Sequence, residues 1–198
     1  MLFRYSSRNL VLRTFPGKGI VEEYADSQGW QIMGFNEADG KRGQPYQVLW
    51  YIEQATVIYL TEDEIARTSY ATINSGSLEL AKRYAAEARL GLNAWADTEL
   101  LQEFDNAQEA QRVGRALLRL GIAAPEEFDN EFFSRISEGF SNPDLRVRNA
   151  AIWACTYSPW PQYRSRLEQV AETDPAEELR ERALLTLEAF DKGGVHEE

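Results

Sequence analysis

The chain has 198 residues, of which 43% are hydrophobic, 12% aromatic and 27% charged, a composition typical of a folded protein with one or two domains. Its 32 acidic and 21 basic residues give a net charge of −11, which disfavours nucleic acid and anionic membranes as partners because phosphate binding needs clustered positive charge. The single cysteine, Cys155, excludes an internal disulfide, and the single histidine, His196, disfavours a histidine-based metal site.

The N-terminal segment carries Arg4 and Arg8 but no apolar stretch that fits a signal peptide or a membrane span. The longest apolar-rich run, residues 48–60, is interrupted by Glu53 and Gln54, which indicates two strands. With no export signal and no cysteine pair, we predict a cytoplasmic protein.

Residues 1–76 are rich in β-branched and aromatic residues and punctuated by glycine, a pattern typical of β-structure. The predicted strands are Leu2–Tyr5, Leu10–Thr14, Trp30–Phe35, Tyr46–Ile52, Thr56–Leu60 and Thr68–Ile73. Ile20, Val21 and Tyr24 predict a short helix, and the turn-rich loop 36–45 predicts a hairpin. Apolar residues of the strand 46–52 point to both faces, so we expect a mainly antiparallel α+β unit whose sheet is at least partly covered on both faces.

From Ser77 onward the apolar spacing becomes helical, and Ser77 is placed to cap the first helix. Six further helical stretches are predicted at about 98–104, 107–120, 126–139, 143–156, 160–172 and 175–190. The predicted breaks between them are Asp105-Asn106, Gly121, Ser141-Asn142-Pro143, Ser158-Pro159 and Asp174-Pro175. Because the connections are short, consecutive helices are expected to pack as antiparallel hairpins.

The helical region contains an internal repeat. Segments that begin at Val113, Val147 and Leu179 align with one another at offsets of 34 and 32 residues, and a weaker match begins at Leu80, 33 residues before Val113. A period in the thirties with two helices per unit indicates hairpins that bury their apolar faces by stacking on their neighbours.

Residues 142–152 and 174–184 resemble the first helices of HEAT repeats, with an Asn-Pro or Asp-Pro turn followed by a Val-Arg-x-x-Ala-like core. Val147, Arg148 and Ala151 match this core, and it is matched again at Leu179, Arg180 and Ala183. The segment at Val113 departs from the pattern, with Gly114 in place of the arginine and Leu117 in place of the alanine. The resemblance extends over about residues 106–190 and does not include the N-terminal part.

Together with the strand pattern of residues 1–76, this resemblance implies an α+β protein of two parts. A mainly antiparallel sheet unit, residues 1–76, would be followed by a short right-handed α-solenoid of HEAT-like helical hairpins, residues 77–198. We expect the sheet unit to cap one end of the solenoid and the polar final helix, with Glu188, Asp191 and Lys192, to close the other. Arg148 and Arg180 are expected to bridge neighbouring turns through carboxylates such as Asp144 and Glu177.

No group of side chains in the sequence predicts catalysis. The glycines near residues 17–19 and 34–40 lack the further residues that a phosphate-binding loop needs. Cys155 is expected to be a small core residue, and the acidic pairs Glu126-Glu127 and Glu177-Glu178 lie in first helical turns, where the helix dipole favours negative charge. We therefore predict that the protein is not an enzyme and has neither a metal nor another cofactor.

The segment 157–164 is the candidate binding loop. Its two prolines stiffen it, and its aromatic residues are of types enriched in interface hot spots. The candidate partner-binding residues are Tyr157, Trp160, Tyr163 and Arg164. In the alternative interpretation, Trp160 folds back to cap its hairpin.

Residues 77–198 hold 14 basic and 23 acidic side chains, a net charge of −9. One interpretation is a solvated surface; the other is steering of a basic protein partner. Our leading hypothesis is a non-catalytic protein–protein interaction module, an adaptor or an immunity-type inhibitor. The HEAT resemblance also allows a small-molecule-handling protein similar to bilin lyase subunits, whereas a HEAT-type DNA glycosylase would need a basic groove. The oligomeric state is not predicted.

Overall fold

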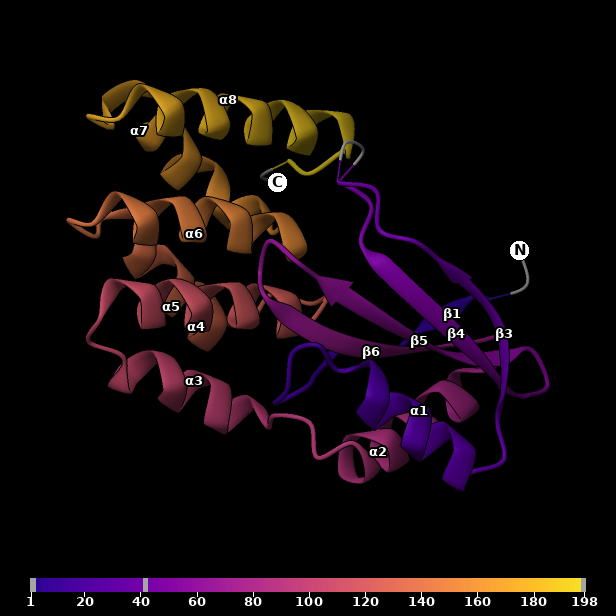
Figure 1. Ribbon diagram of the computed structural model, residues 1–198. Helices are drawn as coiled ribbons and strands as arrows, with labels where there is room; N and C mark the ends of the chain where they lie inside the picture. The colour runs from indigo at the N-terminus through magenta and orange to yellow at the C-terminus, as the bar shows by residue number, and fades with distance from the viewer. Residues whose placement is uncertain (1–2, 41–42, 197–198) are drawn as a thin grey trace. The chain divides into compact units, whose positions relative to one another are not determined.

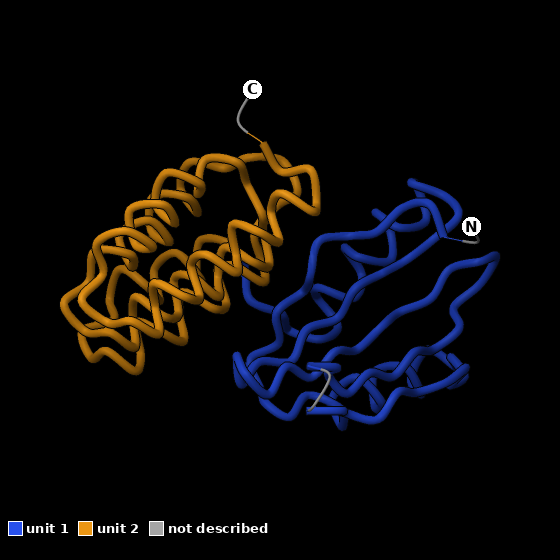
Figure 2. Tube along the Cα trace, turned by 90° about the horizontal axis from the view of Figure 1, so that it is seen from above, with its two compact units in different colours: residues 1–96 blue, residues 97–198 orange. Residues whose placement is uncertain are grey.

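The computed structural model describes residues 3–40 and 43–196. Over this described part, the chain divides into two compact units, residues 1–96 and residues 97–198 (Figure 2). The first unit combines a sheet with helices and the second consists of helices, so the predicted α+β class is confirmed. Leu2, the first residue of the predicted strand 2–5, lies outside the described residues.

The described residues of unit 1 form a six-stranded antiparallel sheet with the path β1-β6-β5-β4-β3, in which β2 also pairs with β6 (Figure 1). The strands are β1 (Tyr5–Ser6), β2 (Leu10–Val11), β3 (Gln31–Asn36), β4 (Tyr46–Glu53), β5 (Thr56–Asp63) and β6 (Thr68–Ser75). The loop 36–45 joins the antiparallel neighbours β3 and β4, so the predicted hairpin is confirmed. The β4–β5 hairpin turns at Gln54 and Ala55, whose φ angles of 39° and 55° are those that a tight hairpin turn requires.

Two helices, α1 (Lys18–Ser27) and α2 (Leu78–Gly91), lie on one face of the sheet (Figure 1). The core of the unit lies between them and the sheet, and it includes Trp50 of β4, Val21 of α1 and Ala88 of α2. On the other face of β4, Tyr51 is 45% exposed.

The change from strand to helix falls where it was expected, since β6 ends at Ser75 and α2 begins at Leu78. The compact unit extends to residue 96, beyond the sequence boundary at residue 76. The reason is that α2 packs against β6 and β1, and that Ala88 and Leu92 belong to the core of the sheet unit. Periodicity marks a change of element, whereas the boundary of a unit depends on which core an element covers.

Unit 2 contains the helices α3 (Asp97–Asn106), α4 (Ala110–Ala123), α5 (Asn130–Phe140), α6 (Leu145–Tyr157), α7 (Arg164–Thr173) and α8 (Glu177–Lys192), with a short 3₁₀ helix η1 (Pro161–Tyr163) before α7. Asp129 and Asp144 cap α5 and α6 by accepting backbone N–H bonds. Helix α6 packs against both α4 and α8, and α5 packs against both α3 and α7. The helices thus form two layers, α4-α6-α8 and α3-α5-α7, and neighbouring helices within each layer contact each other (Figure 1).

The predicted break at Gly121 is wrong, because α4 continues through this residue to Ala123. Gly121 lies at a close approach of α4 to α6. A Cβ atom at this position would be 2.4 Å from the carbonyl oxygen of Ala154, which is closer than packed atoms approach. The glycine therefore permits close helix packing and does not end the helix. The chain leaves the helix at Ala124, which precedes Pro125.

Candidate functional site

The predicted binding loop folds inward. Trp160 is 4% exposed and Tyr163 is fully buried. The indole N–H of Trp160 donates a hydrogen bond of 3.2 Å to the backbone carbonyl of Glu126. The two rings stack on each other, with 5.7 Å between their centroids. Burial raises the pKa of Tyr163 above its ordinary value, so this hydroxyl is neutral at physiological pH.

Three phenylalanines complete an aromatic cluster around this pair. The ring of Phe128 contacts Trp160, and the rings of Phe133 and Phe140 contact Tyr163. Of the four predicted partner-binding residues, Tyr157 and Arg164 remain partly exposed, and Arg164 forms an ion pair of 2.8 Å with Asp191. Trp160 therefore folds inward, as in the alternative interpretation, but it packs against Phe128 and the Glu126 carbonyl in the connection between α4 and α5, and not only on its own hairpin.

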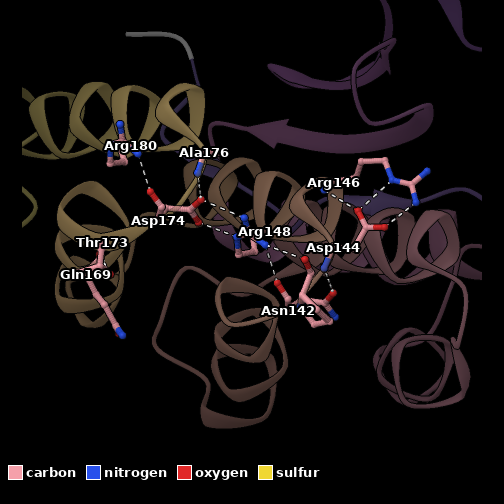
Figure 3. Close-up of polar contacts among 10 residues, drawn as sticks. Asn142, Asp144, Arg146, Arg148, Gln169, Thr173, Asp174, Ala176 and Arg180 are labelled. Carbon is pink, nitrogen blue, oxygen red and sulfur yellow. Dashed lines mark hydrogen bonds and ion pairs between the residues drawn. The ribbon is translucent and has the colours of Figure 1, made fainter.

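A buried ion pair connects the turn before α6 with the turn before α8 (Figure 3). The Arg148 guanidinium donates to both carboxylate oxygens of Asp174, at 2.6 and 3.0 Å. It also donates to the backbone carbonyls of Asn142 and Pro143, at 2.9 and 3.1 Å. Asp174 has 3% of its side chain exposed and Arg148 has 11%. Burial acts to raise the pKa of Asp174, but hydrogen bonds from Arg148 and from the backbone N–H of Ala176 outweigh it and lower that pKa.

The bonds around Asn142 and Arg148 recur 32 residues later (Figure 3). Arg148 donates to the carbonyl of Asn142, and Arg180 donates to the carbonyl of Asp174 at 2.7 Å. The Asn142 side chain accepts the N–H two residues ahead, and the Asp174 side chain does the same, both at 2.9 Å. The sequence repeat is therefore also a repeat of hydrogen bonds.

The expected partner of Arg148 is wrong. The carboxylate of Asp144 pairs with Arg146 at 2.6 Å, and Arg148 reaches forward to Asp174. Beside this pair lies a groove of about 430 Å³, which is lined in part by Arg166 and Gln169. Its most buried charged groups, Arg148 and Asp174, bind each other, so they stabilise the two turns rather than attract a ligand.

The exposed side of α8 has the composition of a binding surface. Leu184 and Leu185 are 52% and 64% exposed. They share a helix face with Glu177, Glu181 and Glu188, at spacings of 4, 7, 8 and 11 residues from Glu177. We call these five residues the α8 outer face. The opposite side of α8 is buried through Leu179, Ala183, Thr186 and Phe190.

From Glu188, Asp191 and Lys192 the sequence predicted a polar final helix. The exposed side of α8 is less polar than that, because Leu184 and Leu185 interrupt its charged face. The sequence held a signal for this surface. The buried stripe of α8 begins at Leu179 and continues at Ala183, Thr186 and Phe190. Leu184 and Leu185 follow Leu179 by five and six residues, spacings that place them outside this stripe.

The described residues show little that is suited to catalysis. Within residues 3–40 and 43–196, no group of three or more histidine, cysteine, aspartate or glutamate side chains is arranged to hold a metal ion. Cys155 is fully buried, its thiol donates to the carbonyl of Ile152 at 3.0 Å, and burial raises the pKa of this thiol. A protonated, buried thiol is a poor nucleophile. Within the same ranges, no helix is both long enough and apolar enough to span a bilayer.

Comparison of the chain with protein-family models, with curated proteins and with solved structures gives no match.

Proposed function

We propose that the protein is a non-catalytic protein-binding module, that unit 2 is a short HEAT-like solenoid, and that the α8 outer face binds a basic, partly apolar protein partner. The observation that carries this proposal is the pair of exposed leucines, Leu184 and Leu185, set among Glu177, Glu181 and Glu188. An apolar centre with a charged surround is the usual composition of a protein interface.

The repeated bonds of unit 2 support the solenoid. Arg148 and Arg180 make the same bond to the carbonyl of the residue six positions earlier, and α4, α6 and α8 pack side by side in one layer. Stacking of similar hairpins produces this pattern, because each hairpin covers the apolar face of the one before it. The described residues leave the α8 outer face uncovered, since Leu184 and Leu185 are 52% and 64% exposed.

The charge of unit 2 supports a basic partner. Residues 97–198 carry 11 basic and 21 acidic side chains, a net charge of −10, whereas residues 1–96 carry 10 and 11. A surface with this charge attracts a basic protein from a distance and raises its association rate at low salt. Buried apolar area then holds the complex, which is the part that Leu184 and Leu185 supply. An adaptor or an inhibitor of a basic protein would use both contributions, the acidic charge for attraction and the leucines for holding the complex.

A model peptide tests the proposal directly. A fluorescein-labelled helical peptide with a leucine face and lysines elsewhere is titrated with the full chain, and its anisotropy and association rate are measured at low and high salt. We expect the Leu184→Ser/Leu185→Ser variant to bind about tenfold more weakly, because two buried leucine contacts are lost. We expect the association rate of the unaltered protein to fall as salt is added.

Ile65→Ser is the matched control, since Ile65 is 55% exposed and lies in unit 1. This variant should bind the peptide as the unaltered protein does. Equal binding by the leucine double variant, or an association rate that salt does not change, would contradict the proposal.

A further inference from the structure

An apolar groove of about 620 Å³ runs along α2 in unit 1. One wall is formed by residues of α2 that include Leu78, Ala81, Ala85 and Leu90, and the other wall is the segment 6–10, from the end of β1 to the start of β2. Leu78 and Leu90 are 48% and 82% exposed. The groove therefore combines a concave shape with a mainly apolar lining, as small-molecule sites do.

The hollow exists because α2 turns alanines toward the segment 6–10. Tyr84, Ala85 and Ala88 pack into or against the core of the unit. Ala81, Ala85 and Ala86 line the groove, and their short side chains leave space where longer ones would fill it. A solvent-exposed helix face is ordinarily polar, so the exposed Leu78, Ala86 and Leu90 beside the groove are unexplained by the fold alone.

The charge of the groove is opposite to that of the chain. Three basic residues, Arg8, Lys82 and Arg89, are among its described lining residues, and none of those lining residues is acidic. The chain as a whole has 32 acidic and 21 basic residues. Lys82 is exposed, and Arg89 is held in place by a hydrogen bond of 3.0 Å from its guanidinium to the carbonyl of Trp95. An apolar channel edged by positive charge is complementary to a ligand with a long apolar part and one anionic group.

The size of the groove favours a small molecule over a protein. Its volume lies within the roughly 300–1,000 Å³ of small-molecule sites, and its 11 lining residues are fewer than the roughly 20–30 that each partner contributes to a stable protein interface. The helical rise from Leu78 to Leu90, both of which line the groove, is about 18 Å, and this length suits an extended alkyl chain. We propose that the α2 groove binds a free long-chain fatty acid, with its alkyl chain along the alanines and its carboxylate at the basic side chains.

The proposal is tested with dodecanoate as the probe, dodecanol as its neutral counterpart and dodecyltrimethylammonium as its cationic one. Binding to the full chain is measured by isothermal titration calorimetry below the micellar concentrations. We expect saturable one-to-one binding of dodecanoate, with affinity about tenfold above that of dodecanol because the carboxylate gains charge-assisted hydrogen bonds. Lys82→Glu should weaken dodecanoate at least fivefold and leave dodecanol unchanged, whereas Ala86→Phe should weaken both by filling the groove.

The controls make the same chemical changes in the other unit. Lys192→Glu and Ala189→Phe alter exposed residues of α8 and should leave both affinities unchanged. Lys82 and Ala86 are themselves exposed, so the groove variants are expected to fold, and far-UV circular dichroism checks this. Absence of saturable dodecanoate binding would overturn the proposal. So would equal affinity for dodecyltrimethylammonium, or binding that neither groove variant reduces. The outcome does not depend on whether the α8 outer face binds a protein.

Discussion

Arg148 joins two turns of unit 2 with a single side chain. Its guanidinium makes four hydrogen bonds, two of them to the carboxylate of Asp174. Asp174 also accepts the N–H of Ala176 just before α8, so one carboxylate both neutralises Arg148 and organises the start of the last helix. At this scale the function of the pair is structural, because neither charge is left for a ligand.

Asp174→Ala should lower the free energy of unfolding by about 3 kcal/mol, because it leaves the Arg148 charge buried without its partner. Glu109→Ala, which removes the acidic partner of an exposed pair with Arg112, should change it by less than about 0.5 kcal/mol. Urea titrations followed by circular dichroism measure both. Equal effects of the two substitutions would show that the buried pair contributes no more than a surface pair.

Two carboxyl groups make the stability of unit 2 dependent on pH. Hydrogen bonds from the side chain and backbone of Arg146 lower the pKa of Asp144 to about 2, and the pKa of Asp174 also lies below its ordinary value, since its bonds to Arg148 and Ala176 outweigh burial. Groups with a lowered pKa stabilise the fold fully above their ordinary pKa and lose this contribution as the pH falls through the lowered value. The free energy of unfolding should therefore decrease below about pH 4.

The substitution Asp174→Asn isolates one of these groups. Protonated aspartate resembles asparagine in charge, so the stability difference between the two proteins should narrow as the pH falls below about 4. Urea titrations at several pH values measure this difference. A difference that stays constant down to the lowest pH would mean that Asp174 is not the group responsible.

The sequence predicted the repeat at Arg148 and Arg180 but not the partner of Arg148. Periodicity identifies equivalent residues, whereas a partner in the next repeat depends on how far one hairpin is displaced against the other. Trp160 shows a similar limit. Its residue type suits both an interface and a core, and only the positions of Phe128 and the Glu126 carbonyl decide between them.

At the scale of elements, helix positions in unit 2 were predicted well because prolines, aspartates and apolar stripes mark them locally. The predicted stretch 143–156 corresponds to α6, Leu145–Tyr157, and the stretch 175–190 corresponds to α8, Glu177–Lys192. Gly121 was misassigned because a glycine that ends a helix and a glycine that allows a close crossing look the same in sequence. Only the distance to α6 separates the two roles.

Two glycines of α4 provide a matched test of helix packing. Gly121→Ala should destabilise the protein by about 1–3 kcal/mol, because its Cβ would be 2.4 Å from the Ala154 oxygen and α4 would have to move away from α6. Gly114→Ala should be neutral or stabilise by up to about 1 kcal/mol, since its Cβ would meet Ala150 at an ordinary 3.5 Å and alanine favours helix. Thermal unfolding of both variants measures the difference. Destabilisation of similar size at both positions would refute the assigned contact.

At the scale of the whole molecule, the two units differ in charge as well as in architecture. Unit 2 carries a net charge of −10 and unit 1 a net charge of −1, and their candidate surfaces follow this division. The α8 outer face is acidic and suited to a basic protein, whereas the α2 groove is edged by basic residues and suited to a fatty acid. The sequence indicated the acidic field of the helical part but not the groove, because the groove depends on where the segment 6–10 lies against α2.

Each unit has a core of its own, and we expect each to fold alone. The core of unit 1 is formed by residues between Leu10 and Ala94, so a fragment of residues 1–96 should unfold cooperatively, as should a fragment of residues 97–198 with a purely helical circular dichroism spectrum. A fragment of residues 1–76 is the informative control. It lacks α2, and with it Ala88 and Leu92 of the core, so it should lose the cooperative transition or aggregate through the uncovered sheet face. If fragment 1–76 melts at the same temperature as fragment 1–96, α2 is not part of the folding unit and the boundary belongs at residue 76.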